Sequence, residues 1–160
     1  MPTSSKRASR VTARTIVLSG IAAGVVSTLT QVVLWVLLTD AFPAILFRDA
    51  RLTAAIVAGT AVLQPAAAFD VYVMLIATVV HFTLSIAFAA ALSVLVTRCS
   101  MGQALAIGAA FGAALYVLNL HLMTFVFPWF AVSRGAITLA AHVAFGASAA
   151  AVYRYARQER

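Results

Sequence analysis

The chain has 160 residues, of which 64% are hydrophobic and only 9% are charged, and its formal net charge is +7. This composition excludes an ordinary soluble domain. Charged residues are absent from three long stretches, which lie between Arg14 and Asp40, between Asp70 and Arg98, and between Arg98 and Arg134. A helix of about 20 apolar residues crosses the hydrocarbon core of a bilayer. The sequence therefore predicts an integral membrane protein.

Four apolar stretches have the length of a membrane-spanning helix. The predicted spans are Thr15–Leu38, Val71–Val96, Gln103–Phe127 and Ala136–Tyr155. They must be helical, because a stretch of this length with an open backbone finds no hydrogen-bond partners in lipid. The predicted fold class is an all-α membrane protein with four transmembrane helices, arranged as two tandem hairpin repeats, and a short interfacial helix in the first outer loop.

The domain organisation follows from these spans. Four segments are predicted: residues 1–14 as a cytoplasmic basic tail, 15–98 as the first membrane hairpin with an outer loop at 40–69, 99–156 as the second membrane hairpin, and 157–160 as a cytoplasmic tail. Within the outer loop, Leu52–Leu63 is apolar but too short to span a bilayer. We expect an interfacial or shallow re-entrant helix there, with Asp49 near its start.

Basic residues concentrate on one side of this four-span topology. The eight on that side are Lys6, Arg7, Arg10, Arg14, Arg98, Arg154, Arg157 and Arg160. The opposite side carries Arg48, Arg51 and Arg134, with Asp40, Asp49 and Asp70 among them. Because an excess of Lys and Arg marks cytoplasmic loops, both termini are predicted to be cytoplasmic. The positive charge is thus explained by topology, and nucleic-acid binding is not expected.

The chain repeats itself at two sets of positions. Gly20, Gly24 and Gln31 in the first span recur at one constant offset as Gly108, Gly112 and Asn119 in the third. Residues 76–81 read I-A-T-V-V-H, and residues 137–142 read I-T-L-A-A-H. The pattern indicates two copies of a membrane hairpin, with histidine and amide side chains placed alike in both.

The glycines of each set share one helix face. Gly-x-x-x-Gly lets two helix backbones approach closely in lipid. We therefore expect Gly20, Gly24, Gly108 and Gly112 to serve packing of the first span against the third. Gln31 and Asn119 each need a polar partner. One interpretation is a structural hydrogen bond between helices, and the other is a ligand-orienting role in a central cleft.

All three histidines lie inside predicted spans, where ionisable groups are uncommon and usually face the bundle interior. The candidate polar centre comprises His81, His142, His121, Gln31, Asn119, Thr78, Ser85 and Thr138. His81 shares a face with Thr78 and Ser85, and His142 with Thr138. His121 lies about 180° from Gly112 around its helix, so it is the weakest member of the set.

Three chemistries suit these histidines. Imidazole titrates near neutral pH, so the group is suited to sensing or carrying protons. Two or three imidazoles also bind copper, zinc or haem iron, although no Glu-x-x-His or His-x-x-x-His spacing favours a metal site here. If a metal is bound, His81 and His142 are the candidate ligands. The third interpretation is that the histidines are structural hydrogen-bonding groups, and no cofactor is expected.

No constellation for catalysis is visible, so an enzyme is not expected. The one glutamate is Glu159 near the C-terminus, and the aspartates lie in or beside the outer loop. Cys99 is the only cysteine, so an intramolecular disulfide is impossible. The expected partners are the lipid bilayer and either further copies of the chain or a larger membrane complex.

Several short motifs resemble the YagU-like family of bacterial inner-membrane proteins. They are Gly24-Val25-Val26-Ser27, the stretches 81–89 and 121–128, His142 and the terminal basic run. The family is associated with acid resistance, and the resemblance implies a bacterial inner-membrane location and a role for His81, His121 and His142. The chain departs from the family pattern at the end of the first span, which lacks an acidic residue, and at Thr138, where an acid would precede the last histidine.

The sequence thus leads to two functional hypotheses. The first is a small inner-membrane protein that is transporter-like or related to acid or other stress, with a polar centre of histidines and amides. The alternative is a binding or assembly module, either a haem- or copper-binding protein or an accessory subunit of a larger membrane complex.

Overall fold

The computed structural model describes residues 4–158, with side chains described for residues 13–157. Within residues 4–158 the chain forms helices and connections and contains no strand. The elements are α1 (Ser4–Leu38), α2 (Ala44–Ala58), η1 (Thr60–Leu63), α3 (Val71–Val96), α4 (Met101–Val117), η2 (Leu118–Leu122), η3 (Met123–Phe125), η4 (Pro128–Ser133) and α5 (Ala136–Gln158).

Four of the helical segments are long and apolar enough to cross a membrane. They are Ala13–Leu38, Val71–Val96, Met101–Phe125 and Ala136–Arg157. The prediction of an all-helical protein with four such segments is confirmed. The predicted span Val71–Val96 matches the observed one, and the other three differ by two residues at one or both ends. The length of an uninterrupted apolar stretch is the property that makes such helices readable from the sequence.

Local capping explains where α3 and α4 begin. The carboxylate of Asp70 accepts hydrogen bonds from the backbone N–H groups of Tyr72 and Val73, at 2.9 and 3.2 Å. Ser100 and Gln103 form a reciprocal capping box at the start of α4. Both arrangements satisfy N–H groups that have no partner within the helix.

The two predicted tails are described only in part. α1 already begins at Ser4, so its helical backbone continues through most of the segment 1–14. At the other end, α5 extends to Gln158. Residues 1–3 and 159–160 lie outside the described residues.

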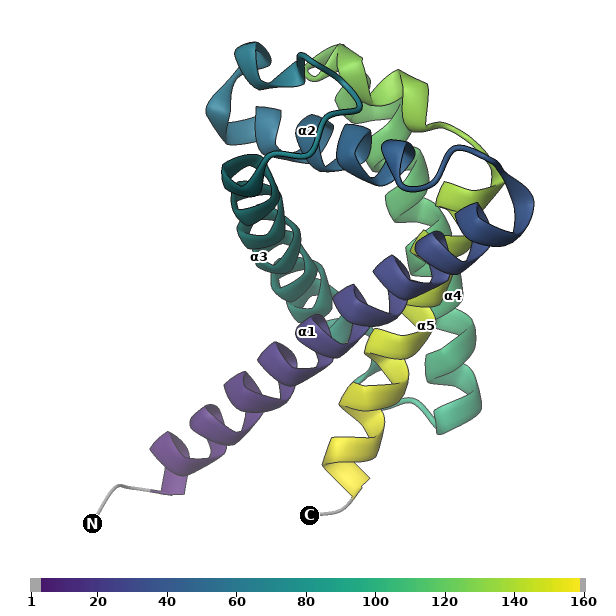
Figure 1. Ribbon diagram of the computed structural model, residues 1–160. Coiled ribbons are helices and arrows are strands. Elements are labelled where there is room, and N and C mark those ends of the chain that lie inside the picture. The colour runs from purple at the N-terminus through teal and green to yellow at the C-terminus, as the bar shows by residue number, and fades with distance from the viewer. Residues whose placement is uncertain (1–3, 159–160) are drawn as a thin grey trace.

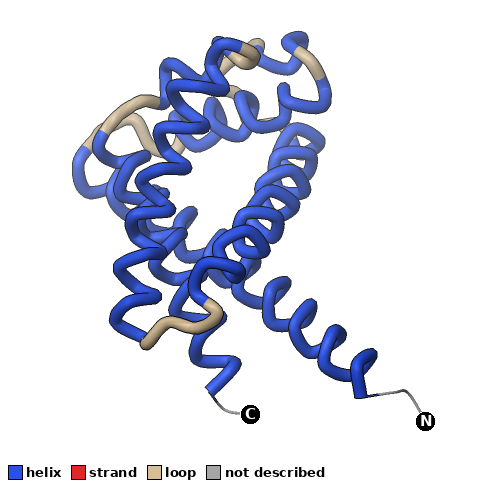
Figure 2. Tube along the Cα trace, turned by 180° about the vertical axis from the view of Figure 1, so that it is seen from behind, coloured by secondary structure: helices blue, strands red, loops and turns tan. Residues whose placement is uncertain are grey.

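α5 packs on α4 and on α1, and α1 packs less extensively on α3 (Figure 1). The start of α1, the turn between α3 and α4, and the end of α5 lie at one end of the molecule. α2 crosses the opposite end, as both views show (Figures 1 and 2). α3 and α4 diverge from their connecting turn toward α2.

The glycine pair of α1 lies against α3, and the glycine pair of α4 lies against α5. A Cβ on Gly20 would lie 2.6 Å from the Cα of Ile86 in α3. Cβ atoms on Gly108 and Gly112 would collide with the backbone of α5 at Gly146 and His142. The glycines therefore lie at close helix contacts, but the expected pairing of the first span with the third is wrong, because α1 and α4 are not among the packed helix pairs of the described chain. A Gly-x-x-x-Gly face predicts close approach without naming the partner.

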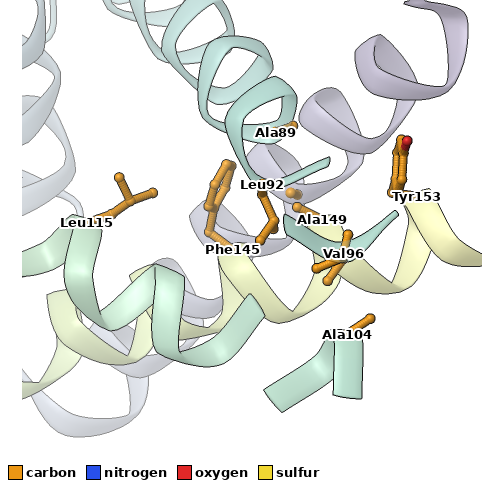
Figure 3. Packing of buried hydrophobic residues seen from close by; sticks show 10 residues of the cluster. Ala89, Leu92, Val96, Ala104, Leu115, Phe145, Ala149 and Tyr153 are labelled. Atoms are coloured by element: carbon orange, nitrogen blue, oxygen red, sulfur yellow. The ribbon is translucent and has the colours of Figure 1, made fainter. Parts of the chain in front are cut away.

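The best-packed core lies in the half of the molecule that contains the α3–α4 turn. Leu92 and Val96 of α3 are 1% and 0% exposed and pack with Ala149 and Tyr153 of α5 (Figure 3). Small residues such as Ala104 let the helices approach closely at this end. Because the helices converge here, space between them is left only toward α2.

α2 lies nearer the N-terminus than the apolar helix expected at Leu52–Leu63. It ends at Ala58, where Gly59 adopts a positive φ of 76°, and a short 3-10 helix follows. Ala54 of α2 packs with Val73 and Ala77 of α3. α2 thus closes one end of the bundle, and Asp49 lies within this helix instead of at its start.

Candidate functional site

A cavity of about 400 Å³ lies between the spanning helices and beneath α2. Its polar lining residues come from every spanning helix, from α2 and from η4: Ser27, Gln31, Asp49, Thr53, His81, Ser85, Asn119, Ser133, Thr138 and His142. Its apolar lining residues are Ile56, Leu84, Phe88, Leu115, Leu118, Leu120, Met123, Phe127, Phe130, Ala141 and Phe145. This volume and mixed lining are typical of small-molecule sites.

His81 reaches the cavity from α3, where it lies against α1. Its Nε2 is 3.2 Å from the carbonyl oxygen of Gly24 and 3.3 Å from the hydroxyl of Thr28. A carbonyl oxygen only accepts, so Nε2 carries the hydrogen in this contact. Ser85, one turn further along α3, also lines the cavity and is 4% exposed. The α1–α3 contact thus fixes the His81 ring at the edge of the cavity.

His142 is fixed by contacts on both ring nitrogens. Its Nδ1 donates to the carbonyl oxygen of Thr138 at 2.8 Å, and its Nε2 is 3.4 Å from the amide nitrogen of Asn119. With the hydrogen on Nδ1, a neutral imidazole accepts at Nε2, which suits an amide donor. The ring of Tyr116 packs edge-on against the imidazole, with the centroids 5.8 Å apart. This set of partners holds one neutral tautomer.

Asn119 is presented by a π-helical turn that follows α4. Residues Leu118–Leu122 leave the regular α-helical ladder, and Arg134 donates to the carbonyl oxygen of Leu120 at 2.6 Å. A second donor of Arg134 reaches the hydroxyl of Thr124 at 2.9 Å. Single π-helical turns occur frequently at functional sites. Here the turn and its arginine position the amide opposite His142.

Asp49 brings a carboxylate to the α2 side of the cavity. Arg48 donates two hydrogen bonds to Oδ1, at 2.7 and 2.9 Å, and the hydroxyl of Ser133 donates a third at 3.0 Å. The side chain of Asp49 is only 19% exposed. Burial raises the pKa of this carboxyl above its ordinary value of 3.8, although Arg48 and Ser133 act in the opposite direction. Asp49 is the one formally charged residue among the lining residues of the described chain.

Three contacts hold α2 over the cavity. The indole N–H of Trp129 in η4 donates to the carbonyl oxygen of Leu52 at 3.0 Å. The hydroxyl of Ser133, also in η4, binds Asp49. On the other side, the guanidinium of Arg51, which is 4% exposed, donates to the carbonyl oxygens of Val62, Gln64 and Ala68. α2 is therefore a fixed wall of the cavity, attached to the segments on either side.

Most of the predicted polar residues lie together in the cavity. These are His81, His142, Gln31, Asn119, Ser85 and Thr138. His121 and Thr78 are not lining residues, and both are exposed. The His121 ring packs on the outer side of Tyr116, at a centroid distance of 5.6 Å, and the Thr78 hydroxyl bonds to its own helix at Met74. Within residues 13–157 no hydrogen bond joins Gln31 to Asn119, because Asn119 pairs with His142.

Sequence reasoning missed Asp49, Thr53 and Ser133 as site residues. Asp49 is the one carboxylate in the otherwise largely apolar stretch Ala44–Ala58, and a lone acid in such a stretch is a usable signal. Ser133 had no such signal, because its place in the site depends on how η4 folds back toward α2.

The described residues contain no group of three His, Cys, Asp or Glu side chains placed to hold a metal ion. The nearest candidates are His81 and His142, but both nitrogens of His142 already contact protein groups. A metal bound there would have to displace Asn119 or the Thr138 carbonyl. The arrangement instead offers hydrogen-bonding groups and one carboxylate to a small ligand. Comparisons with protein-family models, curated proteins and solved structures gave no match.

Proposed function

We propose that the protein is a small, transporter-like inner-membrane protein that binds a small solute or a proton in the cavity between its two hairpins. The observation that carries this proposal is that His81 and His142, one from each hairpin, line the same cavity together with Gln31 and Asn119. A membrane protein that needed only a stable bundle would be expected to fill this space with apolar side chains.

The cost of polar groups in lipid supports this interpretation. Each histidine, amide or hydroxyl within a spanning helix must find a partner or meet water, because hydrocarbon provides none. Ten polar residues converge on one space, as their places in the lining show. Such convergence is typical of a solute pathway or a proton relay. Imidazole is suited to either task, because it exchanges protons near neutral pH.

A tandem hairpin repeat accounts for the placement of the two histidines. In the first hairpin Gly24 of α1 contacts His81 of α3, and in the second Gly112 of α4 contacts His142 of α5. Several transporter folds consist of two structural repeats with the substrate site between them near the middle of the bilayer. Residues of both proposed repeats line the cavity, which supports this comparison.

The proposed orientation places both ends of the chain in the cytoplasm. The α3–α4 turn, which contains Arg98, and the end of α5, which contains Arg154 and Arg157, lie at the end of the bundle opposite α2 (Figure 1). Basic residues mark the cytoplasmic side. α2 then lies at the outer interface and closes the cavity on that side. We also propose that copies of the chain associate through their apolar surfaces, as small membrane proteins often do.

Proton flux in proteoliposomes tests the proposal. Purified protein is reconstituted in liposomes that contain a pH-sensitive dye, a pH gradient is imposed, and the rate of dye response is compared with that of protein-free liposomes. We expect the wild type to dissipate the gradient faster and the double variant His81→Ala, His142→Ala to lose that activity. Equal rates in the wild type, the double variant and empty liposomes would rule out proton movement through this site.

A further inference from the structure

Two residues that line the cavity are exposed on membrane-spanning segments. Among its lining residues in the described chain only Leu84 of α3 and Leu118 of η2 are exposed, at 39% and 37%. α3 and α4 pack against each other far less than α4 and α5 do, and they diverge from their turn toward α2 (Figure 2). Both leucines belong to membrane-spanning segments. This exposed part of the cavity wall would therefore face the acyl chains of the bilayer.

The carboxylate lies at one end of the cavity, where Ile56 and Phe130 also line it, and the other end is apolar. Asp49 and Ser133 lie on the α2 side, beside the outer ends of the spanning helices. Phe88, Leu115 and Phe145 line the opposite side, toward the packed core. A ligand that fits this distribution has a polar group at one end and an apolar body at the other.

The charge of the lining residues indicates which polar group the ligand carries. Asp49 supplies the only formal charge among the described lining residues, and neither lysine nor arginine lines the cavity. All three donors to the carboxylate bind Oδ1, and within residues 13–157 no donor reaches Oδ2. A carboxylate oxygen without a donor favours a cation or an N–H group. Arg48 already pairs with Oδ1, so Oδ2 is the carboxylate oxygen that is left for a ligand.

We infer that the cavity takes a lipophilic amine, which enters sideways from the bilayer between Leu84 and Leu118 and places its ammonium group near Asp49. The inference rests on the proposed function of the cavity as a solute site. His81, His142, Gln31 and Asn119 surround the middle of the ligand, and the phenylalanine and leucine side chains receive its apolar body. An entrance from lipid suits such a compound, because amphipathic amines partition into membranes.

Calorimetric titration of the protein in lipid nanodiscs tests the ligand class, with 2-phenylethylamine as the probe, 2-phenylethanol as its neutral counterpart and empty nanodiscs as the background. We expect saturable binding of the amine, tighter than that of the alcohol by about tenfold or more. Asp49→Asn should remove this preference. Equal binding of amine and alcohol to the wild type, or no saturable binding of either, would overturn the inference. That comparison needs no variant, so it is decisive even if Asp49→Asn fails to fold.

The entry route has its own test. Leu84→Trp narrows the proposed entrance, and Val79→Trp is the matched control, because Val79 is a 66% exposed residue of α3 outside the cavity lining. We expect Leu84→Trp to slow amine association by about threefold or more in stopped-flow measurements, with little change for Val79→Trp. Equal association rates for the two variants would exclude entry between α3 and α4.

The outcomes separate this inference from the proposed function. Amine binding without proton flux would leave the ligand inference standing and remove the proton-moving activity. Proton flux that depends on the two histidines, without amine binding, would overturn the ligand inference alone.

Discussion

The imidazole of His81 donates from Nε2 to the carbonyl oxygen of Gly24, 3.2 Å away across the α1–α3 contact. This approach depends on the missing side chain, because a Cβ on Gly24 would lie 3.1 Å from that nitrogen. Gly112 of α4 makes a close contact with the backbone of α5 at His142. At both contacts, a glycine on one helix lets the histidine-bearing helix approach closely.

Gly112→Ala should separate α4 from α5. Its new methyl group would collide with the backbone at His142, which cannot move aside as a flexible side chain could. We expect a loss of about 1–3 kcal/mol in unfolding free energy, the usual cost of overpacking. Titration with a denaturing detergent, followed by circular dichroism, measures this loss.

Gly102→Ala is the matched control on the same helix. No atom lies within 4 Å of a Cβ built at Gly102, so the substitution should leave stability unchanged or raise it by roughly 0.5 kcal/mol through helix propensity. If both variants lost the same unfolding free energy, the close α4–α5 contact would not explain the effect of Gly112→Ala.

Arg51→Lys should loosen the segment that joins α2 to α3. The arginine is buried and its planar fork reaches three backbone carbonyls at once, which a single ammonium group cannot reproduce. We expect a loss of roughly 2–3 kcal/mol and faster hydrogen exchange in residues 60–69. Arg98→Lys, at an exposed position, is the control. Unchanged exchange in residues 60–69 would show that Arg51 does not hold this segment.

Stability should depend on pH through Asp49. Burial raises its pKa in the folded protein above the ordinary 3.8, so the folded state binds this proton more tightly than the unfolded chain. Stability then falls as pH rises from 3.8 through the raised pKa, and it is regained on acidification. The groups that face Asp49 are Arg48 and Ser133, with His81 and His142 lining the same cavity.

Asp49→Asn isolates this effect from the titration of the histidines. As the pH is lowered from about 7 to about 4, the Tm of the wild type should rise relative to that of the variant. Thermal unfolding in mild detergent at several pH values gives the difference. A difference that does not change with pH would show that the burial of Asp49 has no energetic consequence.

The spanning helices could be predicted from the sequence because their signal is local. An apolar stretch such as Val71–Val96 needs no knowledge of its neighbours to be recognised as a span. Helix partners are a non-local property. The face that carries Gly108 and Gly112 looks alike whether it packs on α1 or on α5, and only the folded chain shows the α5 contact.

The residues of the candidate site also fall into two groups, those with a local signal in the sequence and those placed by tertiary contacts. His81, His142 and Asn119 were recognisable as polar groups inside apolar helices, which lipid makes costly. Asp49 lies outside the spanning helices, in α2, so its sequence position alone does not place it in the site. Its place in the cavity depends on α2 crossing the end of the bundle, a tertiary contact fixed in part by the bond from Trp129 to Leu52.

The histidines themselves provide the most direct test of the central claim, that the cavity and not the outer surface of the helices carries the activity. His142 lines the cavity, whereas His121 is exposed outside it, and both rings pack on Tyr116. The proton-flux rate of His142→Ala should fall by about tenfold or more in proteoliposomes, while His121→Ala should keep the wild-type rate. Equal losses in the two variants, or a larger loss in His121→Ala, would contradict the account.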